Sequence, residues 1–181
     1  MLHCALMKES IKEAGLETIV LSWKGPYTLS ELEKLEEGNG VYLLTGTKKF
    51  SRSLLSFTKV LYCGITERRF SIRVNEKHHQ VPNIKSTNLR VWVGRPIFPA
   101  TYGRSHLELL ETCLVSFWQP ELNQKKKAYY PRKPICLVVK WGKQDNTPYK
   151  RIPGDVAELK DVLWWDCKDW RIGNLKLQRH T

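Results

Sequence analysis

The chain lacks the features of a membrane protein, a disulfide-stabilised protein and a zinc protein. No apolar run approaches the roughly 20 residues that cross a bilayer, and no basic leader precedes a long apolar stretch at the start of the sequence. The five cysteines are an odd number, lie far apart and include no Cys-x-x-Cys pair, which argues against a disulfide framework or a zinc cage. We expect a cytoplasmic protein with reduced thiols and no membrane partner.

Acidic residues are also scarce relative to basic ones. The chain has 18 Asp and Glu against 30 Lys and Arg, so that its net charge is +12. Such an excess attracts polyanions and speeds their capture, although charge alone is equally compatible with a basic protein that merely stays in solution. With 41% apolar residues in 181, the chain is long and apolar enough for one domain with a substantial core.

Apolar periodicity and turn residues predict an irregular mixture of helices and strands. Short apolar runs predict strands over residues 40–44, 59–64, 89–93 and 135–141. Helices are expected over residues 6–14, 28–38, 70–79, 105–118 and 155–163, the second starting with a capping box at Thr28 and Glu31. The order shows no steady strand–helix alternation and therefore favours the α+β class.

Glu111 is out of place on the predicted helix over residues 105–118. On a helical wheel it falls within the apolar arc of Leu107, Leu114 and Trp118. The outward side of that wheel holds Ser105, Glu108, Thr112 and Ser116. Burying a bare carboxylate costs several kcal/mol, so it must find a cation, a donor or a proton. Two interpretations remain: a glutamate at the rim that either extends to solvent or pairs with an arginine, and a metal ligand.

Three fragments occur in a recognisable order. Gly40-Val41-Tyr42 lies on one predicted strand, Tyr62-Cys63-Gly64 lies on the next, and Glu111 precedes the segment Pro120-Glu121-Leu122-Asn123. Over about residues 38–124 this set resembles the GIY-YIG nuclease family. The resemblance implies a small antiparallel sheet of three strands flanked by helices. It also divides the chain into an N-terminal helical extension (1–37), a nuclease core (38–124) and a C-terminal extension (125–181) packed on that core as a single domain.

The match to the family pattern has departures. Val41 and Cys63 stand where the family usually has isoleucine, at apolar positions where volume matters more than identity. The family's helix arginine corresponds best to Arg73. Lys77 occupies the position where the family often has a histidine, and His78 follows directly.

The resemblance implies metal-dependent hydrolysis of DNA and a role for each matched residue. Tyr42 is the expected base, and Tyr62 holds the attacking water or a phosphate oxygen, although the two roles could be exchanged. A tyrosine has a pKa of about 10, so it acts as a base at neutral pH only if a nearby cation or arginine lowers that pKa. Arg73 clamps the phosphate. Three further site residues are expected. His78 shuttles a proton or contacts the phosphate, and Glu111 binds one Mg²⁺ or Mn²⁺. Asn123 orients the bound phosphate or braces Glu111.

Double-stranded DNA is the expected partner. Cutting both strands with one site requires either a homodimer or two successive nicks, and both alternatives stay open. Candidate contacts to its phosphates are Lys48, Lys49, Arg52, Lys77, Lys125, Lys126 and Lys127. The tryptophans near the end either stack on bases or cover the core. A restriction-like endonuclease is the primary hypothesis. The alternatives are an RNase or nonspecific DNase toxin with the same site, and a nucleic-acid-binding module whose site no longer works.

Overall fold

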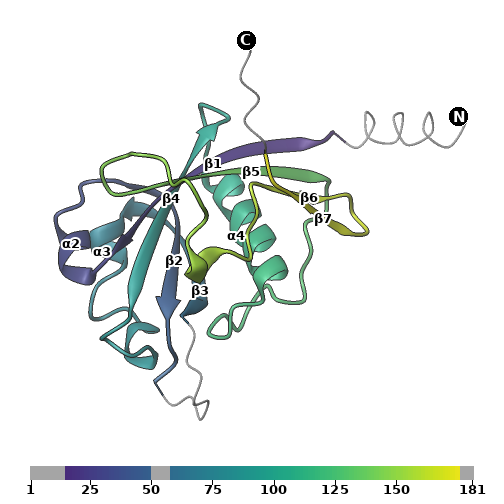
Figure 1. The fold of residues 1–181 in the computed structure, drawn as a ribbon. Coiled ribbons are helices and arrows are strands. Elements are labelled where there is room, and N and C mark those ends of the chain that lie inside the picture. The colour runs from purple at the N-terminus through teal and green to yellow at the C-terminus, as the bar shows by residue number, and fades with distance from the viewer. Residues whose placement is uncertain (1–14, 50–57, 176–181) are drawn as a thin grey trace, which may run out of the picture.

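The computed structural model describes residues 15–49 and 58–175, which build one seven-stranded mixed sheet (Figure 1). The strands are β1 (Glu17–Tyr27), β2 (Gly38–Gly46), β3 (Lys59–Arg69), β4 (Arg90–Phe98), β5 (Ile135–Gly142), β6 (Val162–Trp165) and β7 (Trp170–Gly173). The helices are α2 (Leu29–Glu33), α3 (Phe70–Arg73) and α4 (Arg104–Trp118), with 3-10 turns at Val81–Asn83 and Gly154–Val156. Within the described residues, α4 is the one sizeable helix.

The expected fold class, a three-stranded sheet flanked by helices, is wrong. The strands predicted over 40–44, 59–64 and 89–93 are present as β2, β3 and β4 and lie side by side in antiparallel order. However, β1 pairs antiparallel with β4 and parallel with β5, and β6 and β7 continue the sheet beyond β5. The protein is therefore mostly β.

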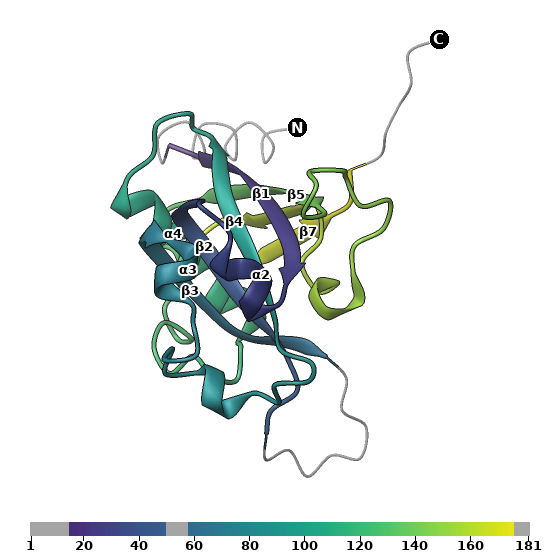
Figure 2. The ribbon, with the colours of Figure 1, turned by 90° about the vertical axis from the view of Figure 1, so that its left-hand side faces the viewer.

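Each face of the sheet carries its own apolar core. Alternation along β2 directs Val41 and Leu43 to the face covered by α4, and directs Tyr42 and Leu44 to the face covered by α2 and α3. Figure 1 shows α4 on one side of the sheet with α2 and α3 on the other, and Figure 2 gives the view at right angles. β3 and β7 are the two edge strands of the sheet. At the edge of β3, side chains from the two faces line one cavity.

One predicted helix is wrong and two others are shorter than expected. The helix expected over 70–79 ends at Arg73, because the Asn75 side chain accepts the Lys77 N–H and so competes with the next helical turn. The helix expected over 155–163 is instead a 3-10 turn followed by β6. The capping box of Thr28 and Glu31 is confirmed, but α2 ends at Glu33.

The helix predicted over 105–118 and the strand predicted over 135–141 are confirmed as α4 and β5. Ser116 is an exception on α4: it was expected to face outward and is buried. The helix expected over 6–14 lies outside the described residues. Within the described part of the chain, no helix is long and apolar enough to span a bilayer.

Candidate active site

Tyr42 and Tyr62 lie on the same face of the sheet, on neighbouring strands. The β2–β3 register places Tyr42 opposite Gly64, and the two tyrosine ring centroids are 6.1 Å apart. A Cβ atom at position 64 would lie 2.5 Å from the Tyr42 hydroxyl oxygen. The glycine that follows the second tyrosine by two residues is therefore needed to give the first tyrosine its room.

His78 joins the tyrosines from the segment that follows α3. Its Nε2 lies 3.0 Å from the Tyr42 hydroxyl oxygen, and its ring stacks on His79 at 4.6 Å. Burial is the first cause that lowers the pKa of His78, to about 4, aided by His79 and the positive charge of Arg73. The ring is therefore neutral at pH 7. Because the Gln80 N–H donates to Nδ1, we place the proton on Nε2, which donates to Tyr42.

The two tyrosines differ in their access to water. Tyr42 is fully buried, and this burial raises its pKa, while the nearby guanidinium of Arg73 acts in the opposite direction. Tyr62 is half-buried. Burial also raises its pKa, the Glu111 carboxylate adds to this effect, and Arg73 opposes both. Of the two phenols, Tyr62 is the one that meets solvent, so the structure gives Tyr42 the position of a support.

Glu111 reaches the same region from α4, on the opposite side of β3. Its side chain is 17% exposed, and the Lys126 ammonium nitrogen lies 2.6 Å from its Oε2. The Glu111 carboxylate therefore pairs with a cation, as its burial requires, but the partner is Lys126 and not an arginine. Glu111 lines a cavity of about 400 Å³ together with Tyr62, His79, Gln80, Leu122, Asn123, Gln124, Lys125 and Lys126.

Asn123 holds the loop that follows α4 against the edge of β3. Its Oδ1 accepts the Cys63 N–H at 2.9 Å, and its Nδ2 donates to the Cys63 carbonyl at 2.8 Å. The Leu122 N–H donates to the Leu61 carbonyl beside it. Both ends of the Asn123 amide are engaged by the backbone, so this residue supports the loop that carries Lys126 instead of orienting a phosphate.

The expected DNA contacts divide into two groups. Lys125, Lys126 and Lys127 follow α4 beside the cavity. Lys48 and Lys49 are exposed beyond β2, where the Lys48 ammonium lies 3.9 Å from Glu121, and they do not line this cavity.

The other expected contacts lie away from the cavity lining or cannot be placed. Lys77 is exposed in the turn after α3 and does not line the cavity. Arg52 lies outside the described residues. Trp165 is buried and Trp170 packs on the core, in agreement with the core-covering interpretation of the tryptophans.

A divalent cation at this site would rely on one protein carboxylate. Across residues 15–49 and 58–175, no group of three or more His, Cys, Asp or Glu side chains gathers in a way that holds a metal. Mg²⁺ commonly keeps several waters and binds through one or two carboxylates plus substrate phosphates. Glu111 fits that mode, since its carboxylate already pairs with a positive charge.

Sequence reasoning missed two members of the site and one contact. His79 and Gln80 line the cavity and were not expected there. Lys126 was expected as a DNA contact, but its ion pair with Glu111 was not. The adjacent pair of histidines was a visible signal for His79. For Gln80 and the Lys126–Glu111 pair no local pattern exists, because these contacts depend on how the loop after α4 returns to β3.

A comparison of the chain with protein-family models, with curated proteins and with solved structures finds no match. The function is therefore argued from the geometry of the site and from its motifs.

Proposed function

We propose that the protein is a metal-dependent endonuclease that hydrolyses phosphodiester bonds in DNA at the cavity beside β3. The observation that carries this proposal is the meeting of Tyr62 and Glu111 in one cavity. Tyr62 lies on β3 and points to the face of the sheet that carries α2 and α3, whereas Glu111 comes from α4 on the other face. A neutral histidine and an arginine support the tyrosines. The resemblance of the motifs to those of the GIY-YIG nucleases and the net charge of +12 support the same activity and the same substrate class.

Tyr62 is the phenol we place in contact with the attacking water or the scissile phosphate, because Tyr42 is shielded from solvent. The negative charge of Glu111 helps keep the pKa of Tyr62 above its ordinary value. A cation bound to the Glu111 carboxylate would offset this negative charge and lower the pKa of Tyr62. Tyr62 would then remove a proton from water more easily. Tyr42, held by His78 Nε2–H, is a positioning residue for Tyr62.

Glu111 is the residue that would hold Mg²⁺ or Mn²⁺, one ion per site. Such an ion supplies a lowered pKa for water and neutralises charge on the phosphate when it is bound. Arg73, exposed at the end of α3 and close enough to affect both tyrosines, is placed to bind a phosphate oxygen.

One observation favours a second candidate, a nucleic-acid-binding module without catalysis. The Lys126 ammonium already occupies the Glu111 carboxylate at 2.6 Å, so a divalent cation has to displace it. If the lysine stays in place, the cavity still attracts phosphate but activates no water. The two candidates therefore differ in their response to a metal and not in their affinity for nucleic acid.

Nicking of supercoiled plasmid separates these candidates. We expect strand cleavage in Mg²⁺ that disappears in EDTA and in Glu111→Ala. The matched control is Glu33→Ala, at an exposed glutamate of α2 that does not line the cavity. Plasmid binding without cleavage under all conditions identifies the binding module. Cleavage of single-stranded RNA but not of DNA identifies the RNase alternative, and equal cleavage in EDTA contradicts the metal-dependent mechanism.

A further inference from the structure

The loop between α4 and β5 forms a second, larger hollow next to the candidate active site. With the outer side of α4 it encloses a groove of about 1010 Å³. Gln124, Lys125 and Lys126 line both the groove and the active-site cavity, so the two hollows adjoin. Anything bound along the groove is therefore led towards Tyr62 and Glu111.

The groove is strongly positive. Its lining contains two acids, Glu17 and Glu108, and Glu108 pairs with Arg104 at 2.9 Å. The cations of the lining are Lys125, Lys126, Lys127, Arg132 and Lys133. Apart from Lys126, none of them has a carboxylate within 4.0 Å in the part of the chain that the structure describes. The surface thus presents charges that a polyanion neutralises better than the protein itself does.

Two exposed tyrosines stand among these charges. Tyr129 is 70% exposed and Tyr130 is 51% exposed, and both line the groove. One face of the Tyr130 ring stacks on Trp165, with centroids 4.9 Å apart and planes at 14°. Trp165 is buried, and its indole N–H donates to the Pro131 carbonyl at 2.8 Å, which fixes the loop beneath the tyrosine. Tyr130 is therefore presented on a rigid base.

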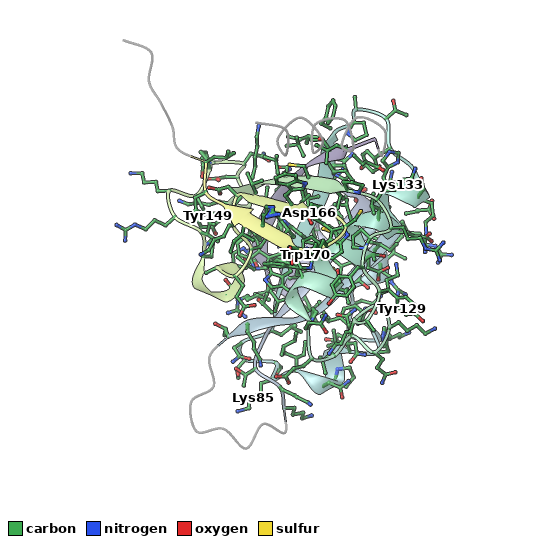
Figure 3. The ribbon with its side chains drawn as sticks, turned by 90° about the vertical axis from the view of Figure 1, so that its right-hand side faces the viewer. Lys85, Tyr129, Lys133, Tyr149, Asp166 and Trp170 are labelled. Carbon is green, nitrogen blue, oxygen red and sulfur yellow. The ribbon has the colours of Figure 1, made fainter. Side chains whose placement is uncertain are left out.

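Tyr129 and Lys133 lie on the same side of the molecule, as Figure 3 shows, so an aromatic ring and a free cation border the same groove. Among the described residues no other aromatic ring packs on Tyr129. Leaving two large rings in water forfeits the free energy that their burial would yield. A ligand that covers them recovers it.

We propose that this groove binds a single-stranded segment of nucleic acid, with its phosphates on the lysines and Arg132 and its bases stacked on Tyr129 and Tyr130. In duplex DNA the bases stack on one another, so a protein that contacts the phosphates finds no free base face for its tyrosines. Unpaired bases expose such faces, and aromatic side chains stack on them. This inference rests on the proposed function, which makes a nucleic acid the substrate, and it specifies the form of that substrate. The preferred substrate carries an unpaired stretch, such as an overhang or flap, beside the bond that is cut.

Binding is tested in EDTA, where no metal-dependent cleavage can occur, by fluorescence anisotropy with a labelled single strand and a blunt duplex of the same sequence. Loss of one stacked base costs about fivefold or more in affinity. We expect this loss for Tyr129→Ala and Tyr130→Ala with the single strand, and wild-type affinity for the Tyr129→Phe variant. The control is Phe98→Ala, an exposed aromatic residue at the end of β4 outside the groove.

Charge is tested in the same assay with Lys133→Glu against Lys143→Glu, an equal change of charge at an exposed lysine that does not line the groove. Lys133→Glu is expected to weaken binding more. Wild-type affinity of both tyrosine-to-alanine variants, or a blunt duplex bound as tightly as the single strand, overturns the inference. If Tyr130→Ala disturbs folding because its ring stacks on Trp165, the affinity of Tyr129→Ala alone decides between the outcomes. Tyrosine-dependent binding without nicking in Mg²⁺ refutes the nuclease and leaves the groove assignment standing.

Discussion

Single side chains at this site divide into those that reach water and those that hold them in place. Tyr62 and Glu111 line the cavity, whereas Tyr42 and His78 are buried behind it and joined by a hydrogen bond of 3.0 Å. Lys126 belongs to the first group and pairs with Glu111. The chemistry thus depends on a small set of contacts that substitutions can remove one at a time.

Lys126→Ala is predicted to lower the Mg²⁺ concentration needed for half-maximal nicking. The ammonium at 2.6 Å from Glu111 Oε2 competes with the divalent ion, so its removal frees the carboxylate. A partly exposed pair of this kind contributes up to about 1 kcal/mol, which corresponds to a shift of about two- to fivefold. Titration of the nicking rate with Mg²⁺, and of the free protein with Mn²⁺ by electron paramagnetic resonance, measures it. Lys125→Ala, an exposed neighbour, is the control, and a higher Mg²⁺ requirement in Lys126→Ala would contradict the competition.

His78 is predicted to make the protein less stable as the pH falls from 6.5 to about 4. Its pKa is lowered to about 4 in the folded protein, so in this window the unfolded chain binds a proton that the folded protein does not. The free energy of unfolding therefore decreases with decreasing pH, by about 3 kcal/mol over the full window. Urea unfolding at pH 7 and pH 4 tests this. His78→Gln should lose that part of the pH dependence. His79→Gln should keep most of it, because burial is the largest cause of the lowered pKa of His78. Equal slopes in wild type and His78→Gln would refute the assignment.

The loop after α4 is the element that joins the two halves of the site. It carries Lys126 to Glu111 and is attached to the edge of β3 by Asn123 and Leu122. An edge strand exposes unpaired backbone groups, and the Asn123 amide satisfies both groups of Cys63 as a strand partner would.

Asn123→Ala is predicted to destabilise the protein by about 2 kcal/mol, because it leaves the buried N–H and carbonyl of Cys63 without these partners. Urea unfolding gives the stability, and amide hydrogen exchange at Cys63 should accelerate. Asn83→Ala, at an exposed asparagine in the 3-10 turn Val81–Asn83, is the matched control and is expected to change stability by less than about 0.5 kcal/mol. Unchanged exchange at Cys63 in Asn123→Ala would show that the loop is held by other contacts.

The elements that the sequence predicted well are those whose own residues decide them. α4 has a long apolar stripe, and β5 begins with an uninterrupted apolar run over residues 135–139. β1 was not predicted, although its buried and half-buried residues alternate, because Gly25-Pro26 reads as a break; the strand instead accommodates it with a register shift before Tyr27. The segment over 155–163 has helical spacing, but its end gains more by pairing β6 with β5.

The site was predictable where a residue conflicts with its local pattern. Glu111 interrupts an apolar stripe and proved to be largely buried and paired. Tyr62 and Gly64 are two residues apart and so face the same side of β3, and the β2–β3 ladder places Tyr42 opposite Gly64. The groove with Tyr129 and Tyr130 was not predictable, because it depends on the return path of a loop and on Trp165 beneath it.

The whole molecule is organised by a sheet that draws on the entire described chain. β1, from the segment expected as an N-terminal extension, lies between β4 and β5 and pairs with β5 through eight residues, Glu17 to Lys24. Leu137, Trp141 and Leu163, from the segment expected as a C-terminal extension, belong to the same apolar core as α4.

Residues 1–124 alone are therefore predicted not to fold cooperatively. Removing β5, β6 and β7 exposes the parallel edge of β1 and one side of the core that contains Ile19 and Leu21. The expected result is loss of the near-ultraviolet circular dichroism of the buried tryptophans and of a sharp thermal transition, measured beside the full chain. A truncated protein that melts sharply and retains the signal would show that residues 1–124 fold without β5, β6 and β7.

The central claim is that the Glu111 carboxylate beside Tyr62 serves metal-dependent phosphodiester hydrolysis. Its most direct test is the single-turnover nicking rate of supercoiled DNA in Mg²⁺ for Glu111→Gln relative to Glu33→Gln, the same substitution at an exposed glutamate of α2 that lines neither hollow. We predict a loss of about a hundredfold or more for Glu111→Gln and less than about twofold for Glu33→Gln, at unchanged stability of the latter. Equal rates for the two variants would contradict the claim.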